Sequence, residues 1–296
     1  MTQAENTREA ALLEEAITVL FCEIDDTYRH LNPNGQLYES LKRLSDPEVI
    51  TLALFQQLRG VESCRAFYAR SRPLLLPPLP RRGRPCSFLF SSPHPQAQAI
   101  PRTLEADRRG GAGRRARNLA HRFDPALGNA PQRGFSQSAG FEGAAWVRWG
   151  SFSVYGVKLH LLCASNRVPI CYELTPANVA DLSLTEELCA EAKLGEEVAR
   201  KLLGDLAYRS AELEDELAEL GILLLTERSR RRPGVRQQIE IALASLKRVF
   251  GLGETLATTL VGLATRIAAK MTAYTYAFLI NRRLGRPQGK IKELWA

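Results

Sequence analysis

The stretch KLLGDLAYRS, residues 201–210, carries the feature on which the fold assignment depends. Two leucines lead into Gly204 and Asp205, and the sequence then turns polar. We interpret this apolar run as a buried strand that ends at Asp205. A strand that brings a carboxylate to its C-terminal end is how open α/β sheets build sites. Since one carboxylate does little chemistry alone, we expect partners of Asp205 elsewhere in the chain.

The sequence on both sides of this stretch alternates between strand and helix patterns. Downstream, SAELEDELAEL predicts an amphipathic helix, Gly221 ends that helix, and ILLLTER predicts another strand. Upstream, residues 149–176 predict a β-hairpin in which Lys158 and His160 share one face. A further helix is expected at about 182–195. This order predicts an α/β domain with a mixed sheet and packed helices.

The segment RQQIEIALASLKRVF, residues 236–250, predicts a helix that carries charge beside an apolar stripe. At 100° per residue, Arg236, Glu240 and Lys247 fall within about 40° of each other. One interpretation is a simple ion pair on a solvated helix face. The other is that this row of charges meets Asp205 over the end of the sheet. The neighbouring stripe that packs the helix on the sheet consists of Ile239, Leu243, Leu246 and Phe250.

Asp205 and Glu240 together favour a metal site. Carboxylates that lie close together repel each other, and a divalent cation keeps them ionised. Mg²⁺ is the natural choice because it is a hard ion that prefers oxygen ligands. A two-metal site of this kind activates water or a 3′-hydroxyl and stabilises the leaving oxygen of a phosphodiester. Arg236 and Lys247 then suit contacts with phosphates beside the metals.

At these residues the chain resembles a known family. The stretch from about 136 to 250 resembles DDE-type transposases of bacterial insertion sequences, which have an RNase H-like catalytic core. Arg236, Glu240 and Lys247 match the last three positions of that family's Tyr-x2-Arg-x3-Glu-x6-Lys signature. The Tyr position falls on Pro233, which departs from the signature. The stretch LLGDLAYRS resembles the segment that carries the family's second catalytic Asp.

The resemblance implies an enzyme that cleaves DNA and transfers strands at transposon ends, with two Mg²⁺ or Mn²⁺ ions. It implies that Asp205 and Glu240 are catalytic metal ligands and that Arg236 and Lys247 contact DNA. The implied partner is the double-stranded DNA of the transposon terminal repeats, and the active form is expected to be a homo-oligomer. The alternatives are a nuclease on the same core, or a catalytically dead remnant that binds DNA or a partner.

The segment YGVKLHLLCASNRVPICYELTPANVAD resembles the family's hairpin, which ends in an acidic turn, here at Asp181. The resemblance implies that Lys158 and His160 lie near the site and contact DNA. Alternatively, they are outward-facing residues of a half-buried hairpin. Asp181 can equally serve as a helix N-cap.

The family's first catalytic Asp should end a strand just before the hairpin, and we find none in frame. The segment ARNLAHRFDPALGNAPQR occupies this place, does not read as a buried strand, and contains Asp124 as its one acid. Codons that encode Asn118 to Pro125, read one base later, permit Thr-Leu-Leu-Ile-Asp-Ser-Thr. That shift would put the missing Asp at the position of Arg122. We therefore expect the chain to be inactive or nearly so.

The composition of residues 65–134 supports this frame hypothesis. The segment holds 14 Arg, no Lys, three acids and ten of the 16 prolines. Its net charge is +11, so that the rest of the chain carries 8 − 11 = −3. The overall charge is therefore poor evidence for DNA binding. The alternative is a flexible basic linker.

Four regions follow from these patterns. Residues 1–63 predict an N-terminal helical domain that binds DNA or packs, with Ser45 or Asp46 as a helix N-cap. Residues 64–135 are the aberrant Arg/Pro-rich segment, expected to be disordered. Residues 136–250 are the incomplete RNase H-like catalytic domain, and residues 251–296 a C-terminal helical segment. No membrane span, signal peptide or zinc cluster is expected, and we expect a cytoplasmic protein.

Overall fold

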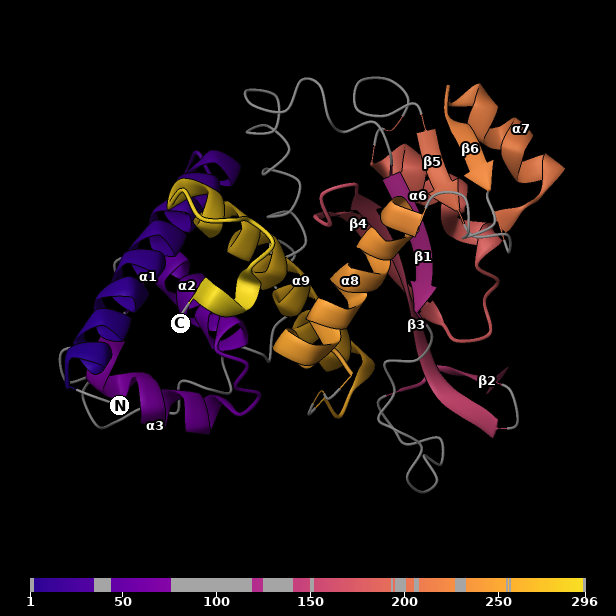
Figure 1. Ribbon diagram of the computed structural model, residues 1–296. Helices are drawn as coiled ribbons and strands as arrows, with labels where there is room; N and C mark the ends of the chain where they lie inside the picture. The colour runs from indigo at the N-terminus through magenta and orange to yellow at the C-terminus, as the bar shows by residue number, and fades with distance from the viewer. Residues whose placement is uncertain are drawn as a thin grey trace. The chain divides into compact units, whose positions relative to one another are not determined.

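The computed structural model describes residues 3–34, 44–75, 119–124, 141–149, 152–192, 194, 201–204, 208–226, 233–253, 255 and 257–294 (Figure 1). The chain divides into two compact units, each described by itself. The helical unit comprises Met1–Thr103, Val249–Gly251 and Thr265–Ala296. The sheet unit comprises Leu104–Arg248 and Leu252–Ala264.

The helical unit combines the first helices of the chain with the last. Its helices are α1 (Gln3–Leu31), α2 (Asp46–Leu58), α3 (Cys64–Leu75) and most of α9 (Leu260–Arg283), with the short 3₁₀ helix η4 (Ile291–Leu294). Every residue of α9 from Lys270 to Asn281 is buried, as expected for a helix that is covered on all sides. The prediction of helical segments at both ends of the chain is confirmed.

Helix α2 begins with the capping signal that the sequence predicts. The Ser45 backbone N–H donates to Glu48 Oε2 at 2.7 Å, and the Glu48 N–H donates to Ser45 Oγ at 3.4 Å. This capping box satisfies two backbone donors that the first turn would leave without partners. Pro47 lies in that first turn, where its missing N–H costs nothing.

The sheet unit contains a mixed sheet. Its strands are β1 (Leu119–Asp124), β2 (Ala145–Trp149), β3 (Phe152–Ala164), β4 (Pro169–Pro176), β5 (Lys201–Gly204) and β6 (Leu223–Thr226). The order across the sheet is β4-β3-β1-β5-β6, and β2 extends it by pairing with the first half of β3. The β3–β4 and β1–β3 pairs are antiparallel, whereas the β1–β5 and β5–β6 pairs are parallel. This is the strand arrangement of an RNase H-like core, as the resemblance implies.

Strand β1 corrects one expectation. The sequence of residues 118–125 suggested no strand, but the backbone from Leu119 to Asp124 pairs with β3 on one side and β5 on the other. Hydrogen bonding to two neighbouring strands outweighs weak intrinsic strand preference, which is the usual hierarchy in central strands. The expected disorder of residues 64–135 is wrong for α3 and β1, which form a helix with a buried Phe67 and a paired strand, and the rest of that segment lies outside the described residues.

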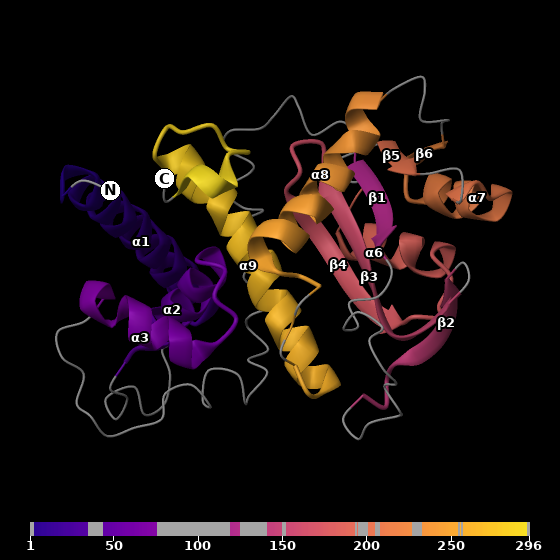
Figure 2. The ribbon, with the colours of Figure 1, turned by 60° about the horizontal axis from the view of Figure 1, so that its bottom comes forward.

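Helices cover the two faces of this sheet. On one face, Leu162 of β3 and Leu202 of β5 pack with α6 (Thr185–Glu191) and α7 (Ala211–Glu219) in one apolar cluster. The helix α8 (Pro233–Phe250) lies alongside β3 and β4 in both views (Figures 1 and 2). Among the described helices, none is long and apolar enough to span a bilayer.

Candidate active site

The parallel strands bring two candidate positions to one edge of the sheet. Strands β1, β5 and β6 run in the same direction, so their C-terminal ends share an edge. Strand β1 ends at Asp124, and β5 ends at Gly204, immediately before Asp205 in the sequence. Asp205 itself lies outside the described residues.

The pairing of β1 with β3 assigns the positions of β1 to faces of the sheet. Arg122 pairs with Leu161 and Asp124 pairs with Leu159, and residues directly opposite in a ladder share a face. Leu159 and Leu161 are fully buried, and strand alternation puts them on the opposite face from Leu162. Positions 122 and 124 of the backbone thus belong to the face opposite α6 and α7.

Helix α8 supplies the apolar stripe that the sequence predicts. Ile239, Leu243 and Leu246 are buried, while Glu240 beside them is half-buried and Lys247 is exposed. Leu159 and Leu161 belong to the sheet face opposite α6 and α7, and α8 lies alongside β3 in both views (Figures 1 and 2). The backbone of Arg236 belongs to α8, but its side chain lies outside the described part of the structure.

Lys158 lies in the interior of the sheet unit and not on its surface. Lys158 is 7% exposed, and its ammonium lies 2.9 Å from Asp181 Oδ1 and 2.5 Å from the Val179 carbonyl oxygen. Asp181 precedes the 3₁₀ helix η2 (Leu182–Leu184) and makes no side-chain cap to it. Asp181 in the acidic turn therefore forms an ion pair with Lys158 of β3, and its side chain does not cap the following helix.

His160 is the next residue of β3 on the same face. It is fully buried, and its Nε2 lies 2.9 Å from Thr175 Oγ1 of β4. Burial lowers the pKa of the imidazole below its ordinary value, and Lys158 lowers it further, whereas Asp181 acts in the opposite direction. The interpretation of Lys158 and His160 as outward-facing residues is wrong, and neither side chain is exposed for a DNA contact in this arrangement.

Among the described side chains, no three His, Cys, Asp or Glu come together in a group that could hold a metal ion. Of the two predicted ligands, Glu240 is described and Asp205 is not.

Sequence reasoning missed two features of this unit. Strand β2 was not expected, although AWVRW contains strand-favouring Trp and Val and pairs with Phe152–Gly156. The ion pair between Lys158 and Asp181 joins residues 23 positions apart, and the acidic turn after the hairpin was its one signal in the sequence.

The family profile for the transposase DDE domain matches residues 129–276, which is half of the chain. The chain belongs to the DDE-domain transposase family. The match runs from before β2 to within α9, so it includes α8 and the strand β5 that precedes Asp205. A comparison with curated proteins gives no match.

Two solved structures of Mos1 are similar to this transposase-family chain. One is a crystal structure of a pre-cleavage Mos1 transpososome, at 13% identity and a TM-score of 0.25, covering 78% of this chain and 77% of that chain. The other is the Mos1 transposase paired-end complex with left transposon end, at 13% identity, a TM-score of 0.28 and the same coverage. Because both TM-scores are below 0.5, the fold assignment is based on the strand order of this chain and not on these two structures.

Proposed function

We propose that the chain descends from a transposase that cleaves DNA and transfers strands at transposon ends. The observation that best supports this is the arrangement of the sheet unit. A central strand, a parallel neighbour that ends before Asp205, and a packed helix that carries Glu240 are the parts that such a site requires. Membership of the family supports the same reaction class.

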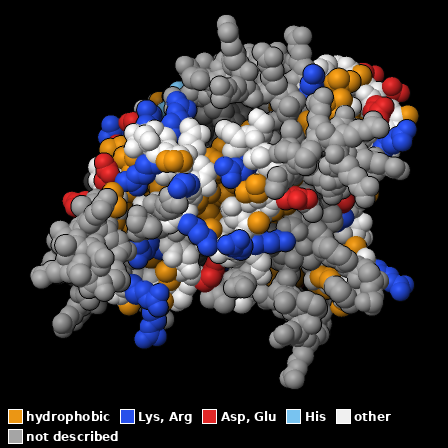
Figure 3. All heavy atoms as spheres, viewed as in Figure 1, with side chains coloured by type: hydrophobic (Ala, Val, Ile, Leu, Met, Phe, Trp, Pro, Cys, Tyr) orange, Lys and Arg blue, Asp and Glu red, His pale blue; other side chains and the backbone are white. Residues whose placement is uncertain are grey.

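In this proposal Asp205 and Glu240 are the metal ligands. Divalent ions bound by carboxylates would supply charge stabilisation at the scissile phosphodiester and lower the pKa of the attacking oxygen. Arg236 and Lys247, on the same helix as Glu240, would hold phosphates of the DNA backbone. The exposed Lys247 and Arg248 near the end of α8 suit that contact. Figure 3 shows Lys and Arg side chains spread over the visible face of the described residues.

The residues present fit a pair of metal ions only in part. The β1–β5 register pairs Leu119 with Leu202 and Ala120 with Leu203. In the sequence, Arg122 follows Ala120 by two residues, as Asp205 follows Leu203 by two residues. A guanidinium cannot ligate a metal, so we propose that position 122 is where the first catalytic Asp is missing, as the frame hypothesis expects. The chain would then bind DNA but transfer strands poorly or not at all.

Isothermal titration calorimetry with Mn²⁺ tests the metal site in this chain. The unaltered protein should bind Mn²⁺ weakly, and both Asp205→Ala and Glu240→Gln should abolish that binding. Glu212→Gln, on the exposed side of α7, is the control that removes one carboxylate away from the site. Identical titrations for the unaltered protein, Asp205→Ala and Glu240→Gln would refute the metal site.

A second candidate is a DNA-binding remnant without catalysis. The proposed loss of a carboxylate at position 122 favours it, because the helix that carries Lys247 is retained. Retained binding to terminal-repeat DNA without any metal-dependent cleavage would identify this function.

A further inference from the structure

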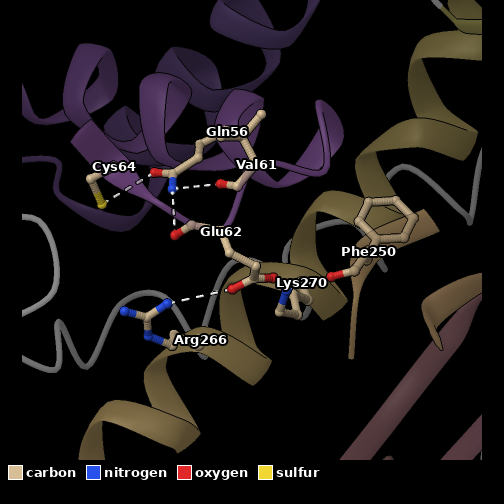
Figure 4. Close-up of polar contacts among 7 residues, drawn as sticks. All are labelled: Gln56, Val61, Glu62, Cys64, Phe250, Arg266 and Lys270. Atoms are coloured by element: carbon tan, nitrogen blue, oxygen red, sulfur yellow. Dashed lines mark hydrogen bonds and ion pairs between the residues drawn. The ribbon is translucent and has the colours of Figure 1, made fainter. Parts of the chain in front are cut away.

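A buried ammonium lies at the C-terminal end of α8. Lys270 of α9 is fully buried, and its Nζ donates to a carboxylate oxygen of Glu62 and to the carbonyl oxygen of Phe250 (Figure 4). Arg266, one turn earlier on α9, lies 3.5 Å from the other Glu62 oxygen. All four residues belong to the helical unit. We call Glu62, Lys270 and the Phe250 carbonyl the α8 clamp.

The turn that carries Glu62 is fixed by a buried glutamine. Gln56 Nε2 donates to the carbonyl oxygens of Val61 at 2.8 Å and Glu62 at 3.2 Å (Figure 4). The Cys64 thiol donates to Gln56 Oε1 at 3.5 Å. Gln56 is 1% exposed, so these bonds form away from competing water. The backbone of the turn is therefore held in the position from which Glu62 reaches Lys270.

Two glycines allow the turn to approach the end of α8. Gly60 has a φ of +63°, and a Cβ on it would lie 3.2 Å from the Val249 carbonyl oxygen. Gly251 has a φ of +58°, and a Cβ on it would lie 3.2 Å from Glu62 Oε1. Side chains other than hydrogen would be strained at both backbone angles and crowded in both places.

The clamp satisfies groups that a helix end leaves open. The last carbonyls of an α-helix have no partner within the helix, and they carry the negative end of its dipole. At Phe250, the Lys270 ammonium donates a hydrogen bond to the free carbonyl and supplies a positive charge at the negative end of the dipole. The Leu252 N–H closes the same end by donating to the Leu246 carbonyl at 3.1 Å.

We propose that Lys270 is a positioning residue that, with Glu62, keeps the last turn of α8 helical and so holds Lys247 and Arg248 in place for the DNA backbone. This positioning role rests on the proposed phosphate contact of Lys247. That lysine lies three residues before Phe250, within the turn that the clamp closes. The charges for DNA would thereby depend on Glu62, which lies 208 residues before Lys270.

Hydrogen exchange measures the clamp without DNA. In Lys270→Met, exchange of the Leu252 amide and of the amides in the last turn of α8 should be at least about tenfold faster than in the unaltered protein. The matched control is Arg283→Gln, which removes another cation of α9 that pairs with Glu23 of α1 at 2.6 Å. The control should leave these amides unchanged.

Salt-dependent DNA binding measures the consequence. With terminal-repeat duplex, Lys247→Gln should reduce the slope of log K against log salt by about one. Lys270→Met should reduce the slope by at least as much, because it releases Arg248 as well as Lys247, and adding Lys247→Gln to Lys270→Met should cause no further loss. If Lys270 had a merely structural role, the effects of Lys270→Met and Lys247→Gln on the slope would add in the double variant.

Each failure has a separate reading. If Lys270→Met does not fold, Glu62→Gln replaces it, because Glu62 is only partly buried, and several-fold faster exchange at Leu252 is expected. Unchanged exchange in the folded variants would overturn the clamp. If exchange is faster in Lys270→Met or Glu62→Gln but Lys247→Gln leaves the salt slope unchanged, the phosphate contact and the positioning role are overturned. The clamp would then only cap the end of α8.

Discussion

In the pairing of β1 with β3, Arg122 lies opposite Leu161, at a backbone position on the sheet face opposite α6 and α7. The parallel neighbour β5 ends at the residue before Asp205, at the same edge of the sheet. We propose that position 122 is where a third carboxylate would complete the site, and the sequence has an arginine there. This relationship links the fold to the expected loss of activity.

Arg122→Asp should strengthen Mn²⁺ binding by about tenfold or more, because a third carboxylate would join Asp205 and Glu240. Calorimetry measures the change. Asp124→Asn is the companion variant, because position 124 belongs to the same face two residues further along β1. It should leave binding as it is in the unaltered chain. Loss of binding in Asp124→Asn would instead make Asp124 a ligand.

The buried His160 should make stability depend on pH. Its pKa in the folded state lies below 6.5, the ordinary value, so the unfolded chain takes up the proton first as pH falls. The free energy of unfolding should therefore decrease as pH is lowered through 6.5, by at most about 1.4 kcal/mol per pH unit, and level off below the folded-state pKa. Urea denaturation across this range measures the effect.

Two variants and a control sharpen this test. His160→Gln should remove the His160 part of the pH dependence, whereas His30→Gln, on the exposed end of α1, should not change it. Asp181→Asn should extend the decrease to lower pH, because Asp181 is the group that raises the His160 pKa. A pH profile that is the same in His160→Gln and in the unaltered chain would contradict the assignment.

Gly251→Ala should cost more stability than Gly285→Ala. Both glycines have positive φ, +58° and +65°, and an alanine there carries a strain of about 1–2 kcal/mol. Only at Gly251 does the new methyl group also meet the Glu62 carboxylate, whereas a Cβ at Gly285 meets nothing within 4 Å. Chemical denaturation of the two variants gives the difference. Equal losses would show that the contact at the clamp is not close.

Phe67→Ala should destabilise the helical unit by about 3–5 kcal/mol, the usual cost of emptying a buried aromatic site. Phe67 is 1% exposed, and its ring lies edge-on to Phe55 of α2 with the centroids 5.7 Å apart. The exposed Arg70→Ala on the same helix is the control. A change in unfolding free energy below about 0.5 kcal/mol would mean that α3 does not pack in the protein as isolated.

Periodicity predicted the elements that pack by one apolar stripe or alternate in strands. The stripe of α8 around Ile239 and Leu243, the N-cap expected at Ser45 or Asp46, and the hairpin of β3 and β4 follow from local spacing. The structure confirms them, with Ser45 as the N-cap. The role of Asp205 as a metal ligand remains a prediction, because Asp205 directly follows the last residue of β5, Gly204, and lies outside the described residues.

Long-range pairing explains what the sequence did not predict. Strand β1 has weak strand preference and forms between two neighbours, β3 and β5, that lie far from it in the sequence. The Lys158–Asp181 pair joins residues 23 positions apart, and the Glu62–Lys270 pair joins residues 208 positions apart. No local pattern encodes such contacts, since only the fold brings the partners together.

The most direct test of the account compares strand transfer by two purified proteins on the same terminal-repeat DNA with Mg²⁺. One is the chain as written, and the other has the alternative reading frame restored across residues 64–135, which puts an Asp at about position 122. Two carboxylates balance only two of the four positive charges on a pair of metal ions, so the chain as written should be inactive or nearly so. The restored protein should transfer strands, and Asp205→Ala or Glu240→Ala in it should abolish the reaction. Comparable rates for the two proteins would contradict the claim that this chain lacks a catalytic carboxylate.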